Sequence, residues 1–162
     1  MQKIATFLWF NDNAEAAVKF YTSIFKNSKI GSISYYPDSA AKGSGQPARS
    51  VMTIAFKLNG QDFIALNGGP NFKFTEAISL MVHCDTQAEL DRYWKKLASG
   101  GGKEVECGWL KDKYGLFWQI VPSFIIKLIS DKDRAKADRV MQVVMNSVKL
   151  DIKKLKAAAK GE

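Results

Sequence analysis

The stretches FLWFNDNAEAAVKFY (residues 7–21) and LMVHCDTQAELDRYW (residues 80–94) share one pattern. In each, a short apolar run leads to an aspartate, Asp12 or Asp85, and then to apolar residues at helical spacing that end in an aromatic pair. This pattern is typical of a strand followed by an amphipathic helix. The sequence therefore predicts the same strand–helix unit twice.

Each predicted helix has start and stop signals. The first is expected from about Ala14 to Phe25, with Asn11 or Asp12 as its cap. The second is expected to be capped by Asp85 or Thr86 and to end before the glycines at 100–102. A polar cap and a glycine stop satisfy the backbone groups that a helix leaves unpaired at its ends.

Strand-like runs follow each helix. Asn59-Gly60 is a two-residue hairpin signal between two of them. The expected strands are Lys29–Tyr36, Ser50–Leu58 and Asp62–Leu66 after the first helix, and Glu104–Leu110 and Leu116–Val121 after the second. Residues 37–48, which contain Gly, Ser and Pro, are expected to be flexible.

The fold class that follows is α+β. Two βαβββ modules, residues 1–67 and 77–122, are joined by a linker at 68–76. A helical tail at 123–162 completes what we predict to be a single domain of residues 1–162. Apolar residues at helical spacing mark the tail: Ile125, Leu128, Ile129, Val140, Val143, Val144 and Leu155.

The composition is that of an ordinary globular protein, with 46% hydrophobic and 25% charged residues. No apolar run reaches the length of a membrane span, and the N-terminus has no signal-peptide pattern. Cys84 and Cys107 have no zinc-type spacing and require no disulfide. We therefore expect a cytoplasmic protein without a membrane partner.

The net charge of +8 raises the question of nucleic-acid binding. Ten of the Lys and Arg residues and five of the Asp and Glu residues lie in residues 127–162, so much of the excess belongs to the tail. No aromatic residue follows Phe124 that could stack on bases. The pattern favours a solvated helix face, and no nucleic-acid partner is expected.

Three stretches carry a resemblance to a known family: FLWFNDNAEAAVKFYTSIFKNSKI, DFIALNGGPNFKFTEAISLMV and CGWLKDKYGLFWQIVP. They are similar to the PhnB-like family, often labelled 3-demethylubiquinone-9 3-methyltransferase-like, of the vicinal oxygen chelate superfamily. The tail stretch DKDRAKADRVMQVVMNSVKLDIKKL also resembles that family's C-terminal segment. The resemblance implies that each module forms half of a sheet around a cavity. It also implies a homodimer or two modules packed side by side.

Metal-dependent members of that superfamily hold one divalent ion with four inward side chains, typically His and Glu, on the first and last strands of each module. Strand alternation places these residues at the corresponding positions: Thr6, Ala65, Ser79 and Gln119. A one-residue change of register would substitute Ala5 and Ile78. Hydroxyls, a methyl group and an amide do not hold a catalytic ion, and a chain with one His cannot form a two-His site. No metal and no cofactor are therefore expected.

The expected function is metal-free binding of a small organic molecule, as in bleomycin-resistance proteins. Apolar walls with a few polar groups are typical of such sites. The predicted cavity residues are Thr6, Leu8, Phe63, Ala65, Asn67, Ser79, Met81, Trp109, Phe117 and Gln119. Alternatively, Gln119 is a buried amide that bonds a neighbouring strand or water, and the aromatic residues simply fill the two cores.

Two other functions stay open. A metal-dependent lyase, isomerase or dioxygenase would need ligands from a partner subunit, or a carboxylate such as Glu76 or Glu106. A dimeric interaction module would use the tail helices to cover the partner. Methyl transfer is not expected, since the glycines at 100–102 follow a helix and precede a strand, the reverse of a nucleotide-binding loop.

The roles of two reactive side chains also stay open. His83 is either a general base or an exposed residue at a strand end. Cys107 is either a nucleophile or a small buried thiol.

Overall fold

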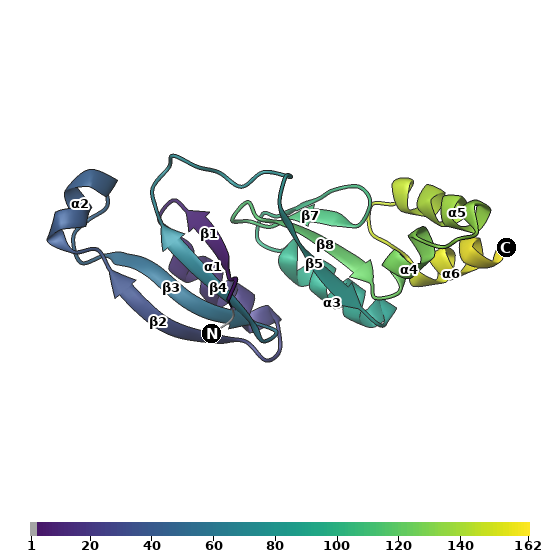
Figure 1. Cartoon of the computed structure of the whole chain (residues 1–162), viewed down its shortest axis with the longest axis horizontal. Coiled ribbons are helices and arrows are strands. Elements are labelled where there is room, and N and C mark those ends of the chain that lie inside the picture. The colour runs from purple at the N-terminus through teal and green to yellow at the C-terminus, as the bar shows by residue number, and fades with distance from the viewer. Residues whose placement is uncertain (1–2) are drawn as a thin grey trace. The chain divides into compact units, whose positions relative to one another are not determined.

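The computed structural model describes residues 3–162 (Figure 1). The chain divides into two compact units, one ending at Phe74 and the other running from Thr75 to Glu162. Each contains a four-stranded mixed sheet with a long helix against it, and the second also contains the tail helices. The α+β prediction of two βαβββ modules with a C-terminal helical extension is confirmed. The division falls inside the predicted linker.

Module one follows the predicted order. Its elements are β1 (Thr6–Phe10), α1 (Ala14–Ile24), β2 (Lys29–Tyr35), α2 (Asp38–Ser44), β3 (Val51–Leu58) and β4 (Gln61–Asn67). The strands lie in the order β1-β4-β3-β2, with β1 parallel to β4 and the other pairs antiparallel. The helix α2 lies within the segment predicted to be flexible, and it buries none of its side chains.

The core of module one lies between α1 and one face of the sheet. The helix buries residues at the spacing of a single stripe: Ala14, Ala17, Val18, Tyr21 and Ile24. The sheet contributes alternate residues that are at most 6% exposed: Leu8, Phe10, Ile54, Phe56, Leu58, Phe63, Ala65 and Asn67. The other face of the sheet is therefore the open one.

The N-terminus of α1 is capped from a distant strand. Asn13 occupies the cap position but makes no side-chain cap hydrogen bond. Instead, Oδ1 of buried Asn67 in β4 accepts a hydrogen bond from the Ala14 amide at 2.8 Å, and its Nδ2 donates to the Val51 carbonyl at 3.0 Å. The predicted caps Asn11 and Asp12 are replaced by this tertiary contact.

Module two repeats the topology with shorter strands. Its elements are β5 (Ser79–Cys84), α3 (Gln87–Leu97), β6 (Lys103–Glu104), β7 (Trp109–Lys111) and β8 (Phe117–Pro122). The order is β5-β8-β7-β6, and β5 is parallel to β8. The predicted strand Glu104–Leu110 is interrupted, because Cys107 (φ 62°) and Gly108 (φ 81°) have left-handed backbone conformations.

Helix α3 is capped as predicted and covers one face of this sheet. The Thr86 side chain accepts a hydrogen bond from the Glu89 amide at 3.2 Å. Beneath the helix lie residues that are at most 2% exposed: Cys84, Leu110, Trp118 and Ile120. Their cross-strand partners Leu80 and Val82 share this face, as the sequence predicts.

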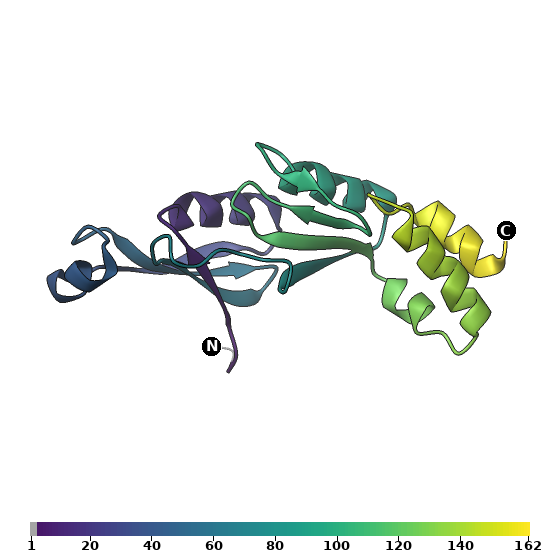
Figure 2. The same cartoon turned by 90° about the horizontal axis from the view of Figure 1, so that it is seen from above.

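The tail forms α4 (Ile125–Ile129), α5 (Arg134–Met145) and α6 (Ile152–Lys160), with α5 and α6 side by side (Figure 2). The connection between α5 and α6 pairs with the turn before β7. The amides of Cys107 and Gly108 donate to the carbonyls of Ser147 and Val148 at 2.7 and 2.8 Å. Leu150, 1% exposed, is buried there. The tail thus packs on module two of its own chain. No helix within residues 3–162 is long and apolar enough to cross a membrane.

Candidate functional site

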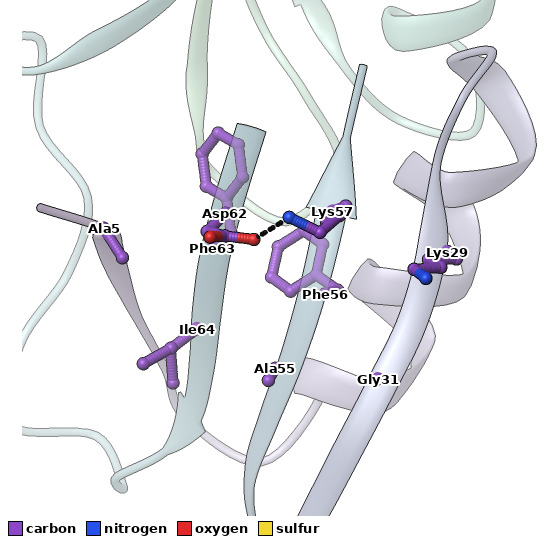
Figure 3. A pocket seen from close by; sticks show the side chains of 9 residues that line it. All are labelled: Ala5, Lys29, Gly31, Ala55, Phe56, Lys57, Asp62, Phe63 and Ile64. Atoms are coloured by element: carbon purple, nitrogen blue, oxygen red, sulfur yellow. Dashed lines mark hydrogen bonds and ion pairs between the residues drawn. The ribbon is translucent and has the colours of Figure 1, made fainter. Parts of the chain in front are cut away.

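A pocket of about 330 Å³ opens on the sheet of module one. Its lining comes from the strands β2, β3 and β4 and from the residue before β1: Ala5, Lys29, Gly31, Ala55, Phe56, Lys57, Asp62, Phe63 and Ile64 (Figure 3). Ala55 and Ile64 alternate along their strands with the residues buried under α1, so they point to the other side of the sheet. The pocket therefore occupies the open face.

Small side chains create this hollow. Ala5, Gly31 and Ala55 present a methyl group or nothing where their neighbours present long side chains. A Cβ on Gly31 would lie 3.1 Å from the Ala55 carbonyl oxygen, so the two strands are close there. Phe56 and Phe63 also line the pocket, but they alternate with Ala55 and Ile64, so their stacked rings, with centroids 5.3 Å apart, lie on the core side of the sheet.

Charged groups occupy one end of the pocket. Lys57 on β3 and Asp62 on β4 are directly opposite each other and form an ion pair (Figure 3). Lys29 on β2 lies opposite Lys57 on its other side. Within residues 3–162 the Lys29 ammonium group makes no ion pair or hydrogen bond. Two lysines and one aspartate leave one positive charge without a partner in an otherwise apolar pocket.

The predicted cavity residues of module one lie mostly on the other face. Leu8 and Ala65 lie under α1, where they are 3% and 0% exposed. The Asn67 side chain caps the helix by accepting a hydrogen bond from the Ala14 amide. Thr6 is half-buried on the same strand face as Leu8. Of this set, only Phe63 lines the pocket. Ala5, which the one-residue change of register would put in place of Thr6, does line the pocket.

The length of the strand–helix connection explains this difference. Three residues, 11–13, join β1 to α1, whereas two residues, 85–86, join β5 to α3. The two aspartates align perfectly in sequence, but one extra residue changes which face of the preceding strand meets the helix. The sequence also contains a signal for the residues of the open face. The Asn59-Gly60 hairpin places Lys57 opposite Asp62, and this register determines which residues of β3 and β4 share that face.

On module two, the predicted residues lie together on the open face. Gln119 Nε2 donates a hydrogen bond to Ser79 Oγ at 2.8 Å. Met81 and Trp109 flank Gln119 on the adjacent strands β5 and β7. Phe117, 3% exposed, is on the same face two residues before Gln119. The amide in this apolar strand therefore binds a side chain of the neighbouring strand.

Residues 2–121 match the family model described as 3-demethylubiquinone-9 3-methyltransferase. The chain belongs to this PhnB-like family. A solved structure described as a PhnB protein from Bacillus cereus is 41% identical, with a TM-score of 0.63, and the match covers 73% of this chain and 97% of that one. A structure from Pseudomonas aeruginosa is 19% identical (TM-score 0.56; 73% and 95% covered) and shows the fold alone. No curated protein matches.

The matched family region ends within β8. The tail helices α4 to α6 come after it, so the resemblance shown by the family model is shorter than the near-complete one expected from the sequence. The PhnB-like part of this chain is the pair of modules.

The PhnB-like modules do not fit the metal centre that the wider superfamily implies. Ser79 and Gln119 offer a hydroxyl and an amide that already bond each other, and Ala65 lies under α1. Ala5, the register alternative, has no donor atom. Within residues 3–162, no three His, Cys, Asp or Glu side chains gather in a way that could hold an ion. The hydroxyl of Ser79 and the amide of Gln119 are suited to hydrogen bonding rather than to holding a metal ion.

Three further side chains of module two carry reactive groups. His83 is exposed at the end of β5 and makes no side-chain hydrogen bond within residues 3–162. Cys107 Sγ lies 3.7 Å from Met145 Sδ of the tail. Cys84 is buried under α3, and this desolvation raises its pKa to about 12. A thiol with such a pKa is not a nucleophile at neutral pH.

Proposed function

We propose that this chain binds a small organic molecule without a metal ion, in the pocket on the open face of module one. The observation that carries the proposal is the pocket itself, a hollow of about 330 Å³ with mainly apolar walls and a few charged groups at one end. Small-molecule sites in proteins have this construction. The hydrogen-bonded pair Ser79–Gln119 on the open face of module two is a further polar surface that a small molecule could contact.

The alternative is a metal-dependent lyase, isomerase or dioxygenase. It would need ligands outside the Ser79 and Gln119 positions, such as a carboxylate from a partner subunit. The family description names a methyltransferase. A glycine-rich loop between a parallel strand and a helix, which the common methyltransferase fold uses, does not occur at 100–102, where the glycines follow α3 and precede β6. Metal-free binding therefore remains the proposal.

A neutral fluorescent probe, N-phenyl-1-naphthylamine, tests the proposal directly. The native protein is titrated with the probe, and the titration is repeated with Ala55→Leu, which fills the hollow. Ala16→Leu makes the same change on the exposed side of α1 and is the matched control. We expect Ala55→Leu to weaken probe binding at least tenfold and Ala16→Leu to leave it unchanged.

Two outcomes overturn the proposal. The first is a native protein that binds no probe, or binds it equally in Ala55→Leu. The second is a change of sedimentation coefficient in Ala55→Leu with unchanged probe binding, which would show that a second copy of the chain fills the hollow. Circular dichroism confirms that the variant is folded, and Gly31→Ala fills the same hollow less severely if it is not. Stoichiometric metal retained after incubation with Zn, Ni, Mn or Fe(II) and desalting would favour the alternative.

We further propose that the protein is a cytoplasmic homodimer with no nucleic-acid partner. Both cysteines are free thiols, which suits a reducing compartment. Three large apolar side chains near the first strands are more than half exposed in the single chain: Ile4 (88%), Phe7 (55%) and Ile78 (69%). Sedimentation equilibrium should give about twice the 18.1 kDa of one chain. A monomer at micromolar concentration would contradict this.

A further inference from the structure

We propose that the ligand of the module-one pocket is a monoanionic molecule with an apolar body, such as an aryl carboxylate or sulfonate, and that Lys29 binds its anionic group. This inference rests on the proposed binding function and names the class of ligand. It follows from Lys29, the pocket lysine that has no ion pair within residues 3–162.

The two lysines at the pocket differ in whether they have a counterion. The Lys57 ammonium group is occupied, because Asp62 faces it across the β3–β4 pair and binds it. Lys29 faces Lys57 across the β2–β3 pair, and like charges in that position destabilise a sheet. An anion bound between them would relieve this repulsion. The pocket thus has a place for one negative charge that no side chain among residues 3–162 supplies.

The rest of the pocket restricts what carries that charge. Ala5, Ala55 and Ile64 offer only aliphatic contact, and the Phe56 and Phe63 rings are buried on the core side of the sheet. A multiply charged phosphate ester would leave charges against these walls, and burying an uncompensated charge is costly. A volume of about 330 Å³ is at the small end of the range for ligand sites, which suits a body of one or two rings.

Two probes with one aromatic body separate charge from shape. 8-Anilino-1-naphthalenesulfonate carries a sulfonate, whereas N-phenyl-1-naphthylamine has the same ring system and no charge. Both are titrated against the native protein, Lys29→Gln and the control Lys19→Gln, which removes an exposed lysine from α1 on the other side of the sheet. We expect Lys29→Gln to weaken sulfonate binding about five- to tenfold, a typical effect of one charge-assisted contact. Binding of the neutral probe should not change.

A second variant should act in the opposite direction. Asp62→Asn removes the counterion of Lys57 and leaves two unpaired lysines at the pocket. We expect it to tighten sulfonate binding severalfold and to leave neutral-probe binding unchanged. Sulfonate binding should also weaken as salt is raised, since partly exposed charges are screened.

The outcomes separate the two proposals. If each probe binds Lys29→Gln with the same affinity as it binds the native protein, the assignment of Lys29 to the anionic group is overturned, and the small-molecule function stands. If Lys19→Gln weakens the sulfonate as much as Lys29→Gln, the attraction belongs to the net charge of the whole protein, and the assignment is likewise overturned. If neither probe binds the native protein, the proposed function itself fails.

Discussion

At the scale of single residues, Asn67 connects strand β4 to the start of α1. Its side chain accepts from the Ala14 amide and donates to the Val51 carbonyl, while its own carbonyl accepts from the Tyr36 hydroxyl at 2.6 Å. Removing the side chain leaves buried backbone groups unpaired. We expect Asn67→Ala to lower the free energy of unfolding by about 2 to 3 kcal/mol. Urea denaturation measures this, with exposed Asn71→Ala as control; equal midpoints would contradict the role of the cap.

Asp112 organises the turn between β7 and β8. Its Oδ1 accepts from the amides of Tyr114 and Leu116, and its Oδ2 accepts from Trp118 Nε1 at 2.8 Å. An asparagine has one acceptor oxygen, so in either orientation its NH2 group faces an N–H donor. We expect Asp112→Asn to cost about 2 to 3 kcal/mol of stability.

A double-mutant cycle checks this account of Asp112. Trp118→Phe removes the indole donor, so Asp112→Asn should cost less in the Trp118→Phe background than in the native protein. The expected coupling is about 1 kcal/mol or more. Strictly additive effects in urea denaturation would show that the carboxylate–indole bond does not stabilise the turn.

The buried Cys84 thiol makes stability depend on alkaline pH. Its pKa is raised from 9.0 to about 12 by burial under α3, followed by the nearby Glu89 carboxylate. Between these values the folded protein keeps a proton that the unfolded chain has released. The free energy of unfolding should therefore fall as the pH rises through this window, and this contribution should be fully present below pH 9.

The measurement compares the native protein with Cys84→Ala in urea at pH 8 and pH 10. The loss of stability between the two pH values should be smaller in Cys84→Ala. Identical losses would mean that Cys84 titrates normally in the folded state.

At the scale of elements, Gln87 at the start of α3 anchors the tail. Its Oε1 accepts from the Ile152 amide at 2.9 Å, and its Nε2 donates to the Leu150 carbonyl at 3.3 Å and to Asp91. Gln87→Ala removes the contacts that hold the α5–α6 connection. We expect trypsin to cleave at the exposed Lys149 about five- to tenfold faster, as a loss of about 1 kcal/mol of local stability permits.

The matched control for the tail is Gln142→Ala, on the exposed side of α5. It should leave the cleavage rate at Lys149 unchanged. Equal rates in Gln87→Ala and the native protein would show that the tail is held by its apolar contacts alone.

The elements that sequence predicted best are those with strong local signals. Helices α1 and α3 begin at the expected residues because their apolar stripes and polar starts lie within the helix or next to it. Helix α2 buries no side chain, so it leaves no apolar periodicity to read. The cap of α1 was missed because Asn67 is a tertiary partner, and sequence spacing does not reveal it.

The candidate site was less predictable than the fold. Ser79 and Gln119 were placed correctly on one strand face, since strand alternation alone decides that. The pocket in module one was missed because a one-residue difference in a connection reversed the face of β1. Lys29 and Gly31 gave no signal of their own, because an exposed lysine and a glycine in a strand have many roles.

At the scale of the whole molecule, the prediction that residues 1–162 form a single domain stays a prediction. It implies that the two units unfold together, although each has its own core. Asn67→Ala destabilises only module one directly. In a single cooperative domain, hydrogen exchange of the Ile120 amide, which bonds the Gly108 carbonyl at 2.8 Å, should nevertheless speed up in this variant. Faster exchange confined to residues 3–74 would show two separate domains.

The unequal connections between strand and helix also define what can be exchanged between the modules. A chimera in which Ser79–His83, five residues, replaced the five residues Thr6–Phe10 would place Met81 where Leu8 now packs, and would turn the strand inside out against α1. Moving each strand together with its connection, 79–86 for 6–13, would keep the correct side chains under the helix. The transferable unit for engineering this duplicated architecture is therefore the strand with its linker, cut at the first residue of the helix.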